Sequence, residues 1–108
     1  MMTKIVLIDP NSMTVSEQTV ELDLKELYRL IDCKSVEGFG WREHFCYCDG
    51  TGLYHSPPLP KVWFRDATHP VAGRVVVTGL PDLEGNETDC LASCSEVESW
   101  IQGYVKAT

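Results

Sequence analysis

The side chains best suited to chemistry are a histidine and two cysteines at alternate positions, His44, Cys46 and Cys48. In a β-strand, alternate side chains point to the same face. Imidazole and thiolate groups are preferred zinc ligands, so Cys90 and Cys94 could complete a tetrahedral site. A structural zinc site usually contains two cysteine pairs with two or more residues inside each, and these cysteines do not supply two such pairs. We therefore expect small buried or edge thiols and no cofactor, with a zinc-stabilised small module as an alternative.

Evidence for catalysis is weak. A cysteine, a histidine and an acid could form a triad, but almost any chain of this size contains such residues. No Gly-x-Ser-x-Gly elbow, phosphate-binding P-loop, dinucleotide fingerprint or His-Glu-x-x-His pair occurs. The glycines of Asp49-Gly50-Thr51-Gly52 could bring backbone N–H groups to an anion, but Asp49 would repel a phosphate, and Asp-Gly is typical of a hairpin turn. We expect a protein that is not an enzyme.

The middle of the chain combines aromatic and basic side chains. Most aromatic residues of a small protein belong to its core, yet tryptophan and tyrosine also carry binding energy at interfaces or stack on a base. The interleaved lysine and arginine could hold an anionic ligand. An alternative function is therefore a nucleotide-signal-binding sponge, whose candidate ligand-binding residues are Trp41, Arg42, Tyr54, Lys61, Trp63 and Arg65.

The last third of the chain is strongly acidic. No lysine or arginine lies between Arg74 and Lys106, and the formal net charge is −7 at pH 7. Surface carboxylates ordinarily keep a small protein soluble, but a concentrated negative surface also repels nucleic acid and attracts basic partners. Such a surface could imitate nucleic-acid phosphates. The candidate partner-binding residues are Asp82, Glu84, Glu87, Asp89, Glu96 and Glu98.

Length and composition favour one globular domain, residues 1–108. The hydrophobic share of 44% and the charged share of 23% are ordinary for globular proteins. No apolar run is long enough to cross a membrane, and Asp9 and Pro10 come too early for a signal peptide. An odd count of five cysteines argues against a disulfide framework. We expect a cytoplasmic monomer or homodimer with reduced thiols.

Hydrophobic periodicity predicts the elements that must position these residues. Residues 4–8 and 14–21 are typical of two paired strands. Asp23 and Glu26 have the spacing of a capping box before a helix that carries leucines at helical intervals through Ile31. Residues 41–54 predict a hairpin that turns at 49–52, and residues 56–60 a proline-rich loop.

The second half of the chain supplies the remaining elements. Residues 71–78 predict a central strand. Ser93 or Ser95 could cap a final helix that carries Val97, Trp100, Ile101 and Tyr104. The predicted fold class is α+β, with a small mixed or antiparallel sheet of four to five strands packed against two helices.

Four segments together resemble a domain-of-unknown-function family of small phage and plasmid proteins. They are the opening strand that starts at Lys4, the helix that starts at Asp23, the turn at Asp49 with the prolines after it, and the run Val71-Ala-Gly-Arg-Val-Val-Val-Thr-Gly. The resemblance implies an α+β fold and a mobile-element setting, and it offers no catalytic residues. The cysteines, the tryptophans and residues 62–69 depart from the family pattern.

Small acidic phage proteins of this kind often block host machinery, so the resemblance suggests a counter-defence, anti-CRISPR-like inhibitor. We expect a phage-encoded protein of the bacterial host cytoplasm that binds a basic surface on a defence component such as a CRISPR effector. Binding would occlude a surface that otherwise holds nucleic acid. Direct contact with nucleic acid or with a membrane is not expected.

Overall fold

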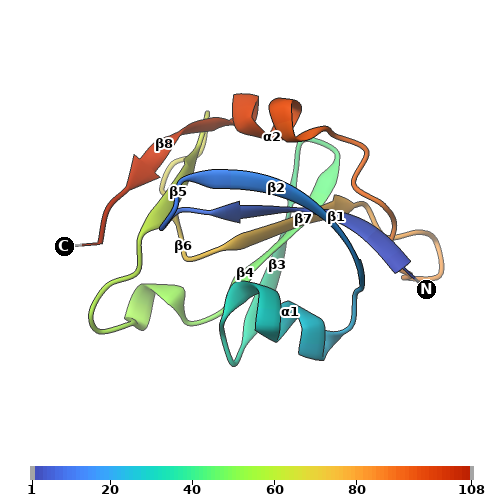
Figure 1. Cartoon of the computed structure of the whole chain (residues 1–108), viewed down its shortest axis with the longest axis horizontal. Helices are drawn as coiled ribbons and strands as arrows, with labels where there is room; N and C mark the ends of the chain where they lie inside the picture. The colour runs from blue at the N-terminus through green and yellow to red at the C-terminus, as the bar shows by residue number, and fades with distance from the viewer. Residues whose placement is uncertain (1, 108) are drawn as a thin grey trace.

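The computed structural model describes residues 2–107, and antiparallel strands make up most of its regular structure (Figure 1). Two α-helices, α1 (Leu24–Ile31) and α2 (Cys94–Trp100), and one 3₁₀ turn, η1 (Gly52–Tyr54), connect the strands. The strands described are β1 (Met2–Asp9), β2 (Thr14–Glu21), β3 (Val36–Trp41), β4 (His44–Asp49), β5 (Lys61–Phe64), β6 (Val71–Ala72), β7 (Val75–Gly79) and β8 (Ile101–Val105).

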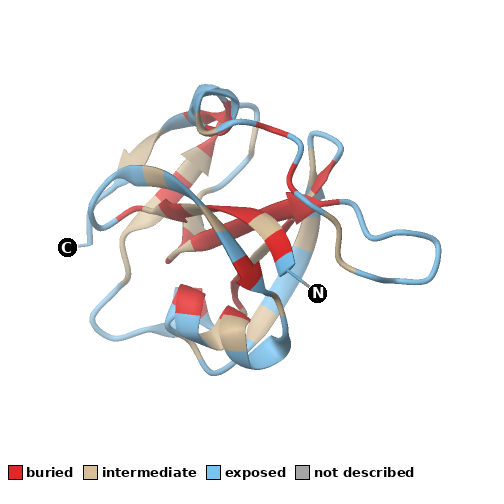
Figure 2. Cartoon of the chain, turned by 45° about the vertical axis from the view of Figure 1, so that its right-hand side comes forward, coloured by how far each residue is buried: buried red, intermediate tan, exposed pale blue. Residues whose placement is uncertain are grey.

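The larger sheet has five strands in the order β2-β1-β7-β4-β3. Its first hairpin agrees with the prediction, because β1 pairs antiparallel with β2 from Met2 opposite Glu21 to Asp9 opposite Thr14. All five residues of β7 are buried, as expected for a β-branched run at the centre of a sheet. Figure 2 shows the buried residues concentrated along these central strands.

The smaller sheet has three strands in the order β6-β5-β8 and packs against one face of the larger sheet. The chain passes directly from β6 in this sheet to β7 in the other. Gly73, between them, has a φ of 83°, which glycine adopts without strain. A core of buried residues joins the two sheets to α2, including Cys46, Val62, Val77 and Val97.

Helix α1 covers the opposite face of the larger sheet. The side chain of Asp23 caps it by accepting a hydrogen bond from the Glu26 amide at 2.8 Å, as the capping box predicts. Leu27, Leu30 and Ile31 are buried in a second core with strand residues of β1 and β7. Neither described helix is long and apolar enough to span a membrane.

The predicted balance of helix and strand is wrong. Four to five strands against two helices were expected of an α+β protein, whereas the described residues form eight strands with only two short helices. The run 71–78 is two strands rather than one, because Gly73 allows the chain to change sheets. Strand β5 has only four residues, too few for periodicity to reveal.

Two boundaries also differ from the predictions. The hairpin turns at Arg42 and Glu43, both with positive φ, and the Asp49-Gly50 segment follows the hairpin instead. The final helix, capped by Ser93, ends at Trp100. Residues 101–105 fit a helical pattern but form β8, where Tyr104 lies opposite Val62. Pairing with β5 outweighs the weak helical preference of this segment.

Candidate functional site

The histidine and cysteines of β4 face the core between the two sheets. As the alternation predicts, His44, Cys46 and Cys48 are all buried. His44 Nδ1 lies 2.9 Å from the Arg42 carbonyl oxygen, and its ring packs against Trp100 with centroids 5.2 Å apart. Burial raises the pKa of the Cys46 thiol to about 12. The contacts of His44, Cys46 and Cys48 are those of side chains that pack in the protein core.

The structure does not assemble the zinc ligands considered in the sequence. Cys90 is buried, with its thiol 3.6 Å from the Ala92 carbonyl oxygen, and Cys94 is the first residue of α2. Cys48 donates to Glu37 Oε1 at 3.9 Å. Within residues 2–107, no three histidine, cysteine or acidic side chains form a group that could hold a metal ion.

The basic and aromatic residues of the middle segment are dispersed. Lys61 Nζ donates to the Leu59 carbonyl at 3.4 Å, Trp63 Nε1 donates to the Ala67 carbonyl at 3.3 Å, and Arg65 Nε donates to the Ser99 carbonyl at 2.9 Å. All three hydrogen bonds are made to backbone carbonyl groups of the protein itself. Of the predicted ligand-binding set, only Trp41 and Tyr54 line a cleft.

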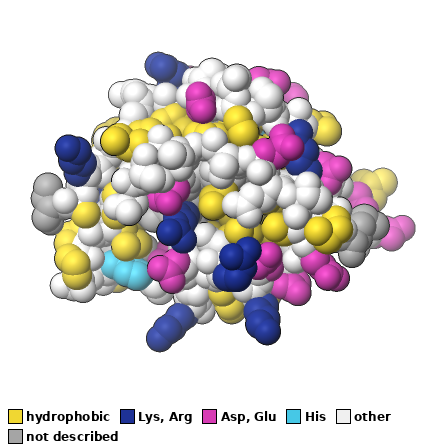
Figure 3. Space-filling model, in the orientation of Figure 1, with side chains coloured by type: hydrophobic (Ala, Val, Ile, Leu, Met, Phe, Trp, Pro, Cys, Tyr) yellow, Lys and Arg dark blue, Asp and Glu magenta, His cyan; other side chains and the backbone are white. Residues whose placement is uncertain are grey.

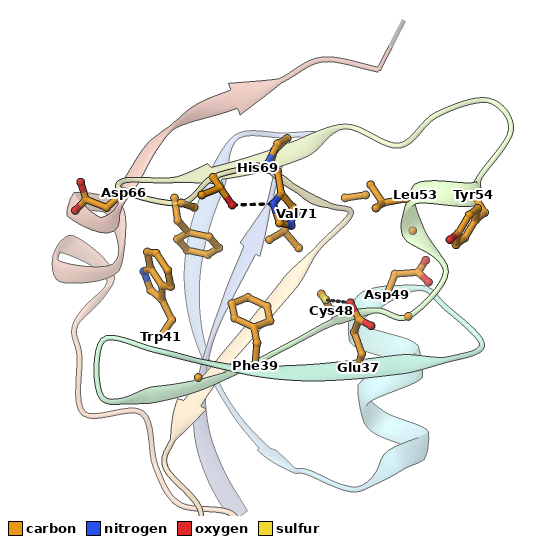
Figure 4. Close-up of a pocket in the computed structure, with 18 residues that line it drawn as sticks. Glu37, Phe39, Trp41, Cys48, Asp49, Leu53, Tyr54, Asp66, His69 and Val71 are labelled. Carbon is orange, nitrogen blue, oxygen red and sulfur yellow. Dashed lines mark hydrogen bonds between the residues drawn. The ribbon is translucent and has the colours of Figure 1, made fainter.

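That cleft, which we call the aromatic cleft, has a volume of about 680 Å³. Strands β3 and β4 form one wall, and η1 with the 66–70 segment and β6 form the other (Figure 4). Glu37, Phe39 and Trp41 reach it because they occupy alternate positions on β3. Its size is that of a small-molecule site.

Aromatic rings build the inner part of the cleft. Phe39 meets Phe64 edge to face with centroids 6.4 Å apart, and Trp41 lies 5.6 Å from the same ring. Phe64 is almost fully buried, so the rings of Phe39 and Trp41 pack against a core side chain. Phe39, Trp41 and Phe64 therefore form an apolar floor that is continuous with the core between the sheets.

Asp49 anchors the segment that closes one end of the cleft. Its side chain is only 2% exposed and lies 2.9 Å from His55 Nε2. Its other oxygen accepts from the Thr51 amide at 2.9 Å and from the Thr51 hydroxyl at 3.2 Å. These contacts hold η1, with Leu53 and Tyr54, at the rim.

The cleft is acidic, whereas the sequence had suggested a site for anions. Glu37, Asp49 and Asp66 line it, and its lining includes no lysine or arginine. Arg42 lies at its mouth, 3.3 Å from Asp66 and 5.7 Å from the centre of the Trp41 ring. The signal missed in the sequence is the alternation of Glu37, Phe39 and Trp41, which places an acid and two rings on one strand face.

Of the six acidic candidates, two are tied to the fold. Tyr47 Oη donates to Glu87 Oε1, and the pKa of Tyr47 is raised by burial and by this carboxylate. Asp89 Oδ1 accepts from the Lys4 amide at 2.9 Å, and the Cys90 amide next to it donates to the Lys4 carbonyl at 2.9 Å. These contacts dock the segment after β7 on β1.

Asp82 shapes the loop that follows β7, residues 80–87, which we call the acidic loop. Its Oδ1 accepts from the amides of Glu84 and Asn86, both at 2.9 Å, and its own amide donates to the Asn86 carbonyl at 3.1 Å. The hydrogen bond that the carboxylate accepts from the Asn86 amide, followed by that from the Glu84 amide, lowers the pKa of Asp82. The loop is closed by the Gly79 amide, which donates to the Thr88 carbonyl at 3.0 Å.

The acidic loop presents apolar and acidic side chains together. Leu83 at its tip is fully exposed, Leu80 is 50% exposed, and Glu84 is exposed beside them. The loop extends from the body of the protein in Figure 2. Glu96 and Glu98 are exposed on α2, a separate element. In the view of Figure 3, acidic side chains are spread over the surface with lysine and arginine side chains among them. The six candidates thus do not form a single patch.

Comparison with known proteins gives a family match. Residues 2–102 match the family model described as Domain of unknown function (DUF3846). No match was found among curated proteins or among solved structures. The family match extends from β1 into β8, and thus includes both sheets, the aromatic cleft and the acidic loop.

Proposed function

The chain belongs to the Domain of unknown function (DUF3846) family, and we propose that it is a non-enzymatic interaction protein that binds a basic surface of a partner protein. The acidic loop makes the contact. The partner class that fits is a protein whose basic surface otherwise holds nucleic acid, such as a CRISPR effector or another host defence component.

The observation that carries this proposal is Leu83 at the tip of a hydrogen-bonded loop. Covering a large, water-exposed apolar side chain with a partner lowers the free energy of the complex. Asp82 already holds the loop in one conformation through its hydrogen bonds with the Glu84 amide, the Asn86 amide and the Asn86 carbonyl. Little conformational entropy is therefore lost when the loop binds a partner. Glu84, next to Leu83, supplies charge complementarity to a basic partner.

Net charge supports the same partner class. A charge of −7 on 108 residues attracts basic surfaces over a distance and repels nucleic acid. Carboxylates that take the place of phosphates would compete directly with nucleic acid. In a phage-encoded protein, this competition would act as counter-defence, in keeping with the resemblance to small phage and plasmid proteins.

The test is a nucleic-acid competition assay on purified CRISPR effectors of several types. The full chain should lower the binding of target DNA or RNA to at least one effector, and added salt should weaken this inhibition because exposed charges are screened. A Leu83→Ser/Glu84→Lys double variant should lose the inhibition.

The matched control is Glu37→Lys, which makes the same charge change on β3, away from the acidic loop. It should inhibit as the unmodified protein does. Equal inhibition by the loop variant and the unmodified protein would remove the acidic loop from the proposal, and no inhibition of any effector would remove CRISPR effectors as the partner.

A further inference from the structure

The aromatic cleft offers acceptors for a positive charge. Glu37 is exposed on its wall, and the only hydrogen bond described for its carboxylate is a long one, 3.9 Å, from the weakly donating Cys48 thiol. Asp49, by contrast, is engaged by His55 and Thr51. Glu37 therefore has acceptor capacity to offer a ligand.

Aromatic faces accompany this carboxylate. Phe39 and Trp41 follow Glu37 on the same face of β3, and Figure 4 shows all three side chains directed into the cleft. The face of an aromatic ring attracts a cation, most strongly for tryptophan. A carboxylate beside aromatic rings in a sheltered cleft is the combination that recognises ammonium and guanidinium groups.

The protein already holds one of its own cations in this way. The Arg42 guanidinium lies 5.7 Å from the Trp41 ring centre and 3.3 Å from Asp66 at the mouth of the cleft. Glu37 and Phe39, on the same face of β3 as Trp41, again place a carboxylate beside a ring, and no lysine or arginine lines the cleft.

We propose that the aromatic cleft binds a small organic cation that carries a guanidinium or ammonium group. The charged group pairs with Glu37, and the apolar body of the ligand lies against Phe39 and Trp41. Nucleotides are disfavoured because the exposed Glu37 carboxylate repels phosphate. This site is separate from the acidic loop, so it stands independently of the protein partner proposed above.

The test uses titration calorimetry of the full chain with three probes: agmatine, which carries a guanidinium and an ammonium group, the uncharged butanediol, and the anion AMP. Agmatine should bind, and the other two should give no saturable heat. The indole N–H resonance of Trp41, assigned with a Trp41→Phe variant, should shift as agmatine is added.

Glu37→Gln keeps the shape of the side chain and should weaken agmatine binding about tenfold or more, as expected for the loss of a charge-assisted hydrogen bond. The control Glu98→Gln removes the same charge from α2 and should leave the affinity unchanged. The proposal is overturned if agmatine does not bind, if AMP binds equally well, or if both variants weaken binding equally, since the last result would mean attraction to net charge alone.

Discussion

Tyr47 and Glu87 join two segments that are distant in sequence, and this pair yields a stability prediction. Tyr47→Phe removes the donor to a half-buried carboxylate. Hydrogen bonds to charged groups contribute about 1.5–3 kcal/mol, so we expect a loss of that size in the free energy of unfolding, measured with urea.

The matched control is Tyr54→Phe, which deletes the same hydroxyl from a side chain that is 87% exposed. Its free energy of unfolding should change by less than about 0.5 kcal/mol. Equal destabilisation by the two variants would mean that the Tyr47 hydroxyl makes no special contribution.

The buried thiols of β4 give a pH-dependent prediction. Burial is the main cause that raises the pKa of Cys46 and of Cys48 to about 12. Because the thiolate is the reactive form, both should resist iodoacetamide in the native state at neutral and mildly alkaline pH. Their reactivity should rise only as the pH approaches these pKa values, or once urea unfolds the chain.

Peptide mapping by mass spectrometry identifies which cysteines are alkylated at each pH. Cys94 is only partly buried at the start of α2 and serves as the internal reference, since it should react before them. Alkylation of Cys46 in the folded protein at the rate of Cys94 would contradict the burial described for β4.

At the scale of elements, the passage from β6 to β7 depends on Gly73. Its φ of 83° is unfavourable for any residue with a Cβ, and a Cβ there would lie 3.3 Å from Leu59 Cδ1. Gly73→Ala should therefore lower the free energy of unfolding by about 1–2 kcal/mol, measured by denaturant titration.

Gly103→Ala on β8 is the control for this prediction. A Cβ at Gly103 would meet no atom within 4 Å, and this glycine has no positive φ. The variant should be neutral or slightly stabilising. If Gly73→Ala were equally neutral, the passage between the sheets would not depend on a left-handed residue.

The sequence predicts well the elements that have strong local signals. The β1–β2 hairpin, the α1 cap at Asp23 and the buried run of β7 follow from β-branched runs and capping chemistry. The second sheet was missed because its strands are short and owe their existence to partners far away in sequence, such as Tyr104 opposite Val62. Local periodicity contains no information on such pairing.

The candidate sites also differ in whether a local sequence signal or only the three-dimensional structure reveals them. The acidic third was recognised from composition, but only the structure shows that Glu87 and Asp89 accept hydrogen bonds from Tyr47 and from the Lys4 amide. Glu84, Glu96 and Glu98 are exposed on the acidic loop and on α2. The aromatic cleft could not be predicted, because β3, η1 and the 66–70 segment meet only in three dimensions.

At the scale of the whole molecule, two sheets and two helices position two different surfaces. The larger sheet has α1 on one face and the smaller sheet with α2 on the other. The aromatic cleft opens between the edge strand β3 and the smaller sheet, while the acidic loop leaves from the end of β7. A protein partner at the loop and a small cation in the cleft could thus be bound by separate parts of the molecule.

The most direct test of the central claim is a pull-down from bacterial host cytoplasm, at low and moderate salt, with mass spectrometry of the captured proteins. The unmodified chain should retain a nucleic-acid-binding protein that Glu37→Lys also retains and that Leu83→Ser/Glu84→Lys loses, with weaker capture at the higher salt. Retention of the same protein by the loop variant, at both salt concentrations, would contradict the claim that the acidic loop is the contact surface.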